Sequence, residues 1–243
     1  MNYPKYNQNL MYKLLNYDKE FKSAFTISIP VMMGYLVLGF AFGLLLSSFH
    51  YDWYLAPIMS IFIYAGALQF VAIGFFNAKM GLIDIAIATL FINIRQSFYG
   101  LSLLKKFKHT GKFKKYLIFG LTDETYGLLT TVEEDKNLSK THFYFFLSAL
   151  NQSYWIIGST IGAILGSNIE FNTNGLEFSL TALFIVLCIE QYKKLKNILP
   201  FIIGAVASLV ALVIVPSDKM LITSIVISLV LLLTFEKRIE NDK

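Results

Sequence analysis

One arginine lies in a stretch that is otherwise apolar. Arg95 is in residues 81–104, between Asn93 and Gln96, and only two of the 21 basic residues are arginine. A guanidinium in such a stretch needs a cavity or a partner, and its planar fork binds a carboxylate through two hydrogen bonds, which lysine cannot do. The pattern predicts that Arg95 binds a substrate carboxylate or pairs with an acidic side chain, with Asn93 and Gln96 adding neutral hydrogen bonds. The alternative is that Arg95 only extends toward the lysine-rich stretch 105–115, about 15 Å away along a helix.

Two adjacent carboxyl groups interrupt another apolar stretch. Asp123 and Glu124 lie in residues 116–132. On a helix, neighbouring side chains point about 100° apart, so one carboxylate is expected to meet Arg95 while the other lines a cavity. Apolar surroundings favour the protonated form of a carboxyl group, which makes either residue a candidate proton carrier. The alternative is that Asp123 only caps a helix at the membrane surface.

Gln69 is an amide inside the apolar residues 54–76, close to Gly66. A buried amide needs hydrogen-bond partners. Gln69 is therefore expected either to bind polar groups of a ligand or to tie two helices together, and the sequence does not separate these two roles.

Glycines recur in two further apolar stretches, 26–48 and 143–166. Spacings of four residues place small residues on one helix face, where they allow two backbones to approach closely. The glycines with this expected packing role are Gly34, Gly39, Gly43, Gly158, Gly162 and Gly166.

The elements that carry these residues are those of a membrane protein. Hydrophobic residues make up 56% of the 243 residues and charged residues 15%, whereas soluble domains have about 45–50% and 25%. The lysines behind the net charge of +5 cluster beside apolar runs, which indicates a membrane surface and not a nucleic-acid partner. The sequence predicts an all-α, polytopic membrane protein with about seven or eight hydrophobic segments: 26–48, 54–76, 81–104, 116–132, 143–166, 177–191, 197–215 and 219–235.

Lysine-rich stretches are expected on the cytoplasmic side. This rule places the N-terminal stretch 1–22, the stretch 105–115 and the tail 239–243 inside. Three apolar segments, an odd number, separate the first two of these, so at least one segment would be broken or re-entrant. We expect the break in the third and fourth segments, because both have polar centres. The alternative is that the charge rule fails for one loop.

Residues 23–238 are predicted to form a single transmembrane domain, whose first segment is too long for a cleaved signal peptide. The halves 26–132 and 143–235 are possible repeats. The match that suggests the repeat is sparse: Phe62-Ile63 with Gln69-Phe70 recurs as Phe184-Ile185 with Gln191-Tyr192.

The sequence gives no indication of a metal, a cofactor or an enzyme. Cys188 is the single cysteine, and His50, His109 and His142 are far apart in predicted loops, so no zinc-ligand spacing occurs. An intramembrane enzyme would need a nucleophile and a base, or metal ligands, at membrane depth. A scaffold protein would not need ionisable groups there.

Taken together, the motifs resemble the AzlC-type branched-chain amino-acid permeases, the large subunit of the LIV-E exporters. Their order and spacing fit over about residues 22–130, and the second half is similar only in hydropathy and in scattered residues. The residues that carry the resemblance are Pro30-Val31, Gly34-Tyr35, Gly39, Ala41-Phe42-Gly43, Tyr64-Ala65-Gly66, Gln69-Phe70, Asn93-Ile94-Arg95 and Thr122-Asp123-Glu124.

The resemblance implies a multi-pass protein of the bacterial inner membrane that exports leucine, isoleucine, valine and sometimes methionine. It also implies a small hydrophobic AzlD-type partner subunit and coupling to the proton gradient. The family commonly has histidine at the position of Gln96, which cannot titrate, so Asp123 or Glu124 would carry more of the coupling. The alternatives are a passive channel, a transporter of another small zwitterion, or a membrane scaffold subunit.

Overall fold

The computed structural model describes residues 5–131, 139–168, 185, 188–189, 192–193 and 196–234. Every regular element in these ranges is helical, which agrees with the predicted all-α class. The elements are α1 (Lys5–Ser48), α2 (Leu55–Phe62), α3 (Gly66–Asn77), α4 (Leu82–Leu103), η1 (Gly111–Phe113), α5 (Lys114–Phe119), α6 (Asp123–Thr131), α7 (Lys140–Asn168), α9 (Leu199–Ile214) and α10 (Ser217–Thr234).

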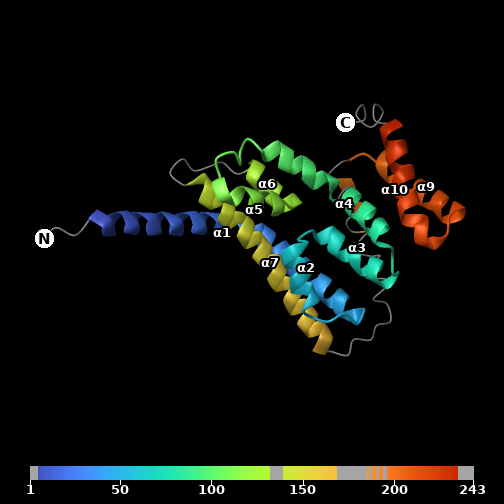
Figure 1. Ribbon diagram of the computed structural model, residues 1–243, viewed down its shortest axis with the longest axis horizontal. Helices are drawn as coiled ribbons and strands as arrows, with labels where there is room; N and C mark the ends of the chain where they lie inside the picture. Colours follow the sequence, from blue (N-terminus) through green and yellow to red (C-terminus); the bar gives the residue numbers. More distant parts are fainter. Residues whose placement is uncertain are drawn as a thin grey trace. The chain divides into compact units, whose positions relative to one another are not determined.

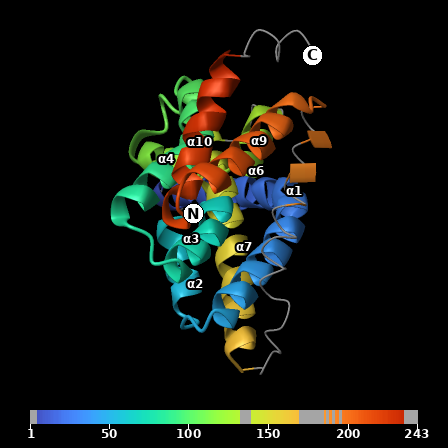
Figure 2. The same cartoon turned by 90° about the vertical axis from the view of Figure 1, so that its right-hand side faces the viewer.

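The chain divides into two compact units. The first comprises Met1–Gln69 and Ile94–Phe171, and the second comprises Phe70–Asn93 and Asn172–Lys243. In the first unit, α1 and α7 lie side by side and form the most extensive interface (Figures 1 and 2). In the second unit, α9 packs against α10. The predicted repeat and the segment 177–191 depend on residues that fall largely outside the described ranges.

One helix among the described residues is long and apolar enough to span a membrane, namely Tyr17–Ser48 of α1. Shorter apolar helices are Gly66–Asn77, Leu199–Ile214 and Thr223–Thr234. The predicted number of crossings therefore stays a prediction. The helix α1 begins at Lys5 and continues through Pro30, so it also takes in most of the predicted N-terminal stretch.

Glycine allows the backbones of α1 and α7 to touch. A Cβ atom added at Gly43 would overlap the carbonyl oxygen of Ser159, and one added at Gly162 would overlap that of Phe40. Between helices in lipid, such close packing replaces the hydrophobic effect as the main source of attraction. The other glycines with close contacts at this interface are Gly39, Gly158 and Gly166.

Gly34 does not belong to this interface. A Cβ atom added there would have nothing within 4 Å. Gly34 precedes Gly39 by five residues, which turns it about 140° away from the packed face. Among the described residues, Gly34 therefore makes no close helix contact of the kind expected for it.

The expected break occurs in the fourth apolar segment and not in the third. Residues 120–122 divide the fourth segment into α5 and α6, whereas the third segment forms one continuous helix, α4. The expectation of a broken third segment is wrong for a physical reason. Its polar side chains project from an intact helix without replacing any backbone hydrogen bond.

A further break, which the sequence pattern does not predict, divides the second apolar segment. Between the end of α2 at Phe62 and the start of α3 at Gly66, Tyr64 has a φ angle of 43°. Non-glycine residues rarely adopt this left-handed conformation. The carbonyl oxygen of Ile61, in the last turn of α2, accepts a hydrogen bond of 3.1 Å from Gln152 Nε2 of α7. The side chain of α7 thereby satisfies a backbone group beside the break.

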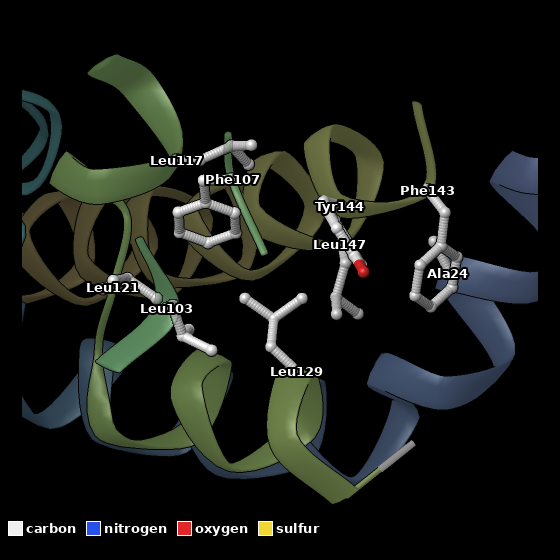
Figure 3. Close-up of a cluster of buried hydrophobic side chains, with 9 residues drawn as sticks. All are labelled: Ala24, Leu103, Phe107, Leu117, Leu121, Leu129, Phe143, Tyr144 and Leu147. Atoms are coloured by element: carbon white, nitrogen blue, oxygen red, sulfur yellow. The ribbon is translucent and has the colours of Figure 1, made fainter. Parts of the chain in front are cut away.

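A cluster of buried hydrophobic side chains fastens α5 and α6 to α7 (Figure 3). Phe107, which is fully buried, draws the lysine-rich stretch 105–115 into this cluster. Lys106 Nζ donates a 2.6 Å hydrogen bond to the Leu129 carbonyl near the end of α6, where helix carbonyls lack partners. The nine residues of the cluster are Ala24, Leu103, Phe107, Leu117, Leu121, Leu129, Phe143, Tyr144 and Leu147.

Candidate functional site

The structure pairs the arginine of α4 with a carboxylate in the first turn of α6. Arg95 Nη2 lies 2.9 Å from Asp123 Oδ2, and the two side chains are 42% and 26% exposed. Arg95 Nε and Asp123 Oδ1 are buried atoms that have no hydrogen-bond partner among the described residues. The pair therefore uses one edge of each group. The Tyr99 hydroxyl also interacts with the Asp123 carboxylate, although without a hydrogen bond of standard geometry to Oδ1.

Glu124, the next residue, has a different partner. Its Oε2 accepts a hydrogen bond of 2.6 Å from the hydroxyl group of Tyr35 in α1. Adjacent positions on α6 point about 100° apart, which explains why Asp123 faces α4 while Glu124 faces α1. Both carboxylates lie in the first turn of α6, where the helix dipole favours negative charge.

Thr122 fixes the start of α6. Its Oγ1 accepts a 3.2 Å hydrogen bond from the backbone N–H of Thr125, which is an N-cap interaction. The Thr122 hydroxyl also lies 2.6 Å from that of Tyr35 and 3.0 Å from that of Thr125. From α7, Asn151 Nδ2 donates to Thr125 Oγ1 at 3.0 Å. A continuous set of hydrogen bonds thus connects α7 and α1 to Glu124.

Two tyrosines lie beside the ion pair on α4 and α6. The rings of Tyr99 and Tyr126 stack with centroids 4.2 Å apart and an interplanar angle of 12°. Ser102 Oγ lies 3.3 Å from the Tyr126 hydroxyl. Because Tyr99 follows Arg95 by four residues, the stack is on the same side of α4 as the guanidinium. The stack therefore helps to hold α4 and α6 at the separation that the ion pair needs.

Gln69 lies in the interior of the first unit. Its Oε1 accepts a 2.9 Å hydrogen bond from Trp155 Nε1, and its Nε2 donates to Ser60 Oγ at 3.2 Å. The Ser60 hydroxyl in turn lies 2.8 Å from that of Ser159. Both ends of the amide are occupied by protein groups and Gln69 is fully buried. This arrangement favours the role of tying helices together over ligand binding.

Asn93 and Gln96 do not converge on the guanidinium. On an ideal helix, Gln96 points about 100° and Asn93 about 160° away from Arg95. Both side chains are partly buried. The angle between the Gln96 and Arg95 side chains is the smaller of the two, so Gln96 remains the better candidate for a neutral contact to a ligand held by Arg95.

Replacing Gln69 by leucine should lower stability without weakening substrate binding. The change leaves the Trp155 N–H and the Ser60 hydroxyl without their amide partner, and one unsatisfied buried group costs about 1–3 kcal/mol. Thermal unfolding of the purified protein measures the first effect. The half-saturating concentration of leucine, a substrate that the motif resemblance implies, measures the second effect in counterflow. The matched control is Gln96→Leu on α4, which should change stability by less than about 0.5 kcal/mol and alter counterflow instead. A Gln69→Leu protein of normal stability and weakened affinity would contradict the structural role.

Several residues of the network were not identified from the sequence. Tyr35 and Thr122 belong to sequence motifs that do not predict these hydrogen bonds, and Thr125 and Asn151 are not among the predicted site residues. A signal was present, since Asn151 interrupts an apolar segment just as Gln69 does. Both Asn151 and Thr125 are fully buried. Among the described residues, no three side chains of His, Cys, Asp or Glu come together as metal ligands would.

The described elements are helices, several of them apolar, and this composition indicates the class of helical membrane proteins. The AzlC protein family matches residues 30–169. A membrane protein of Helicobacter pylori strain J99 is 42% identical over 222 residues, which cover 91% of this chain and 97% of the relative. The branched-chain amino acid transport protein AzlC of Bacillus subtilis strain 168 is 39% identical over 221 residues, 91% of this chain and 87% of the relative.

A third relative, the inner membrane protein YgaZ of Escherichia coli K12, is 29% identical over 190 residues, covering 74% of this chain and 77% of the relative. The chain belongs to the AzlC family, and the resemblance of its motifs to that family is confirmed. No solved structure matches the chain.

Proposed function

We propose that the protein is the large subunit of an exporter of branched-chain amino acids in the bacterial inner membrane, which it crosses several times. The Bacillus subtilis relative is named as a branched-chain amino acid transport protein, and the Escherichia coli relative as an inner membrane protein. The proposed partner is a small hydrophobic subunit of the AzlD type. No enzymatic reaction is part of the proposal.

The observation that carries the proposal is the incomplete ion pair of Arg95 and Asp123. A zwitterionic α-amino acid has one carboxylate and one ammonium group bonded to the same carbon atom. Neither Arg95 Nε nor Asp123 Oδ1 has a hydrogen bond of standard geometry among the described residues. The donor suits the carboxylate of the substrate, and the acceptor suits its ammonium group. The substrate would thus complete both groups, with Gln96 as a candidate neutral contact.

The aliphatic side chain of the substrate would contact apolar and aromatic groups beside the pair, such as Tyr99 and Tyr126. An apolar contact discriminates by only about 1–3 kcal/mol per methylene. Leucine, isoleucine, valine and methionine are therefore expected to compete with one another.

Coupling to protons is assigned to Glu124. Asp123 is paired with Arg95, and Gln96 has no ionisable group. Glu124, by contrast, is an exposed residue, and its hydrogen-bond partner is a neutral hydroxyl group. A carboxylate that can exchange its proton with water and also contacts the protein interior is suited to carry a coupling proton.

Reconstituted protein should accumulate leucine against a concentration gradient. Proteoliposomes that contain this chain and its small partner, with an imposed pH gradient, should concentrate radiolabelled leucine, and a protonophore should abolish the accumulation. Efflux that only equilibrates leucine, with no response to the protonophore, would indicate a passive channel. Proteoliposomes with the small partner alone provide the background.

A further inference from the structure

The hydroxyl group of Tyr35 has one proton and two close neighbours. Its oxygen lies 2.6 Å from Glu124 Oε2 and 2.6 Å from Thr122 Oγ1. Both separations are hydrogen-bond distances, and each such bond needs one proton between the oxygens. Because the Tyr35 proton can serve only one of them, its neighbour must supply the other. The direction of these bonds therefore depends on whether Glu124 carries a proton.

With Glu124 ionised, its carboxylate can only accept. Tyr35 then donates to Glu124, and Thr122 donates to Tyr35. Thr125, whose hydroxyl lies 3.0 Å from that of Thr122, donates to Thr122. At the far end, Asn151 Nδ2 donates to Thr125. Every hydroxyl group in this order donates once and accepts at least once.

A proton that binds to Glu124 Oε2 reverses this order. The new O–H group donates to Tyr35, whose own proton turns toward Thr122. Thr122 then donates to Thr125, as the 3.0 Å distance allows. The only covalent bond that forms is the O–H bond of Glu124, since every hydroxyl proton turns without leaving its oxygen. The Thr125 proton loses Thr122 as its acceptor and becomes available to another.

The hydroxyl oxygen of Tyr64 is the proposed acceptor of the Thr125 proton. This hydroxyl group interacts with Tyr35 and Thr125, yet it is buried without a hydrogen bond of standard geometry among the described residues. Tyr64 is also the residue with a left-handed backbone between α2 and α3. A hydrogen bond from Thr125 would satisfy the Tyr64 oxygen only when Glu124 is protonated.

We propose that Tyr35, Thr122 and Thr125 form a relay of hydroxyl groups that transmits the protonation state of Glu124 to Tyr64 at the break between α2 and α3. The physiological role of the relay rests on the proposed function. In that role, the coupling proton on Glu124 would alter the hydrogen bonding at the break between α2 and α3. Its hydrogen bonds do not depend on which solute is carried.

The effect of Glu124 on the relay must be distinguished from the effects of other ionisable groups nearby. Asp123 precedes Glu124 on α6 and is engaged by Arg95 of α4. From α1 and from the α2–α3 break, the titratable neighbours are Tyr35 and Tyr64. The Asp123→Asn variant therefore belongs in the experiment beside Glu124→Gln.

Trp155 of α7 provides a reporter. Its ring lies 5.5 Å from that of Tyr35, centroid to centroid. It also lies 3.0 Å from where a Cβ atom at Gly66, the first residue of α3, would stand. Because the chain has two tryptophans, the substitution Trp53→Phe leaves Trp155 as the single source of indole fluorescence.

The test is a pH titration of Trp155 emission in the Trp53→Phe protein, in lipid nanodiscs without substrate, over about pH 4–9. The relay predicts one transition, which Glu124→Gln abolishes and Asp123→Asn preserves. Tyr35→Phe and Thr125→Val should also abolish it, because each removes one hydroxyl from the relay. Thr125→Ser, which keeps the hydroxyl group, should restore it with a midpoint within about 0.5 pH unit.

The matched control is Tyr154→Phe. Tyr154 is a buried tyrosine of α7 whose hydroxyl lies 3.0 Å from Ser28 Oγ, outside the relay. Its replacement should leave the transition unchanged. A transition that survives Thr125→Val, or that Tyr154→Phe abolishes as completely as Tyr35→Phe, overturns the relay. An intact Glu124-dependent transition in protein that shows no leucine counterflow contradicts the proposed function and leaves the relay standing.

Discussion

Replacing Arg95 with glutamine should reduce leucine counterflow about thirtyfold, equivalent to about 2 kcal/mol. Truncating a hydrogen-bonded charge pair costs about 2–5 kcal/mol when the pair is buried. The lower end applies because the Arg95 side chain is 42% exposed and solvent screens it. In the proposed role of Arg95, the loss has two sources, since the substrate carboxylate loses its guanidinium and Asp123 loses its partner. Counterflow in proteoliposomes with matched protein content measures the change.

Arg95→Lys separates charge from geometry. Lysine keeps the positive charge and can pair with Asp123, but it has no planar fork with which to hold a second carboxylate. We expect stability close to that of the parent protein and a clearly raised half-saturating leucine concentration. Retained affinity and rate in Arg95→Lys would remove Arg95 from the role of binding the carboxylate.

The double substitution Arg95→Asp with Asp123→Arg tests whether the ion pair serves only to hold α4 against α6. The exchanged protein can restore the ion pair between α4 and α6, but it presents the two charges to the substrate in reversed positions. Proper folding without transport is the expected result. Full recovery of transport would mean that the pair serves to hold α4 against α6 and does not contact the amino acid.

The pairing of Arg95 with Asp123 could be anticipated from the sequence because the physics there is local and strong. A guanidinium in an apolar helix must find an anion or water, and few carboxylates lie in apolar stretches of this chain. Helical periodicity then turns Glu124 away from Asp123, so the separate partners of the two carboxylates follow from the same 100° rule. Neither inference needed knowledge of the tertiary arrangement.

The break at Tyr64 could not be anticipated in this way. No proline interrupts residues 54–76 near Tyr64, and tyrosine does not by itself favour a left-handed backbone. The break is stabilised from outside, since Gln152 of α7 satisfies the carbonyl of Ile61. Similarly, the polar centre of the third segment suggested a break, but polar side chains alone do not interrupt the backbone hydrogen bonds of α4.

Replacing Gly162 with alanine should destabilise the first unit by about 3 kcal/mol or more, at the upper end of the cost of overpacking. The added methyl group would overlap the carbonyl oxygen of Phe40 and lie 2.8 Å from its carbonyl carbon. A side chain could rotate away from such a clash, but a helix backbone cannot. The helices α1 and α7 would have to separate along their length, which weakens every close contact of the interface. Thermal unfolding of the detergent-solubilised protein measures the loss.

The neighbouring helix α1 provides the control. Gly34→Ala on α1 adds the same methyl group where nothing lies within 4 Å, and alanine is a better helix former than glycine by up to about 1 kcal/mol. Gly34→Ala should leave the free energy of unfolding unchanged or raise it slightly. If Gly34→Ala and Gly162→Ala unfold at the same temperature, close backbone packing does not hold α1 against α7.

The double substitution Gly43→Ala with Gly162→Ala makes a stronger test of the same interface. A methyl group at Gly43 would overlap the carbonyl oxygen of Ser159, so each substitution alone forces α1 and α7 apart. Once one has done so, the second meets less resistance, because residues in one interface share the displacement. The double variant should therefore lose clearly less stability than the sum of the single losses. Simple additivity would mean that each clash is relieved locally and that α1 and α7 do not move as rigid bodies.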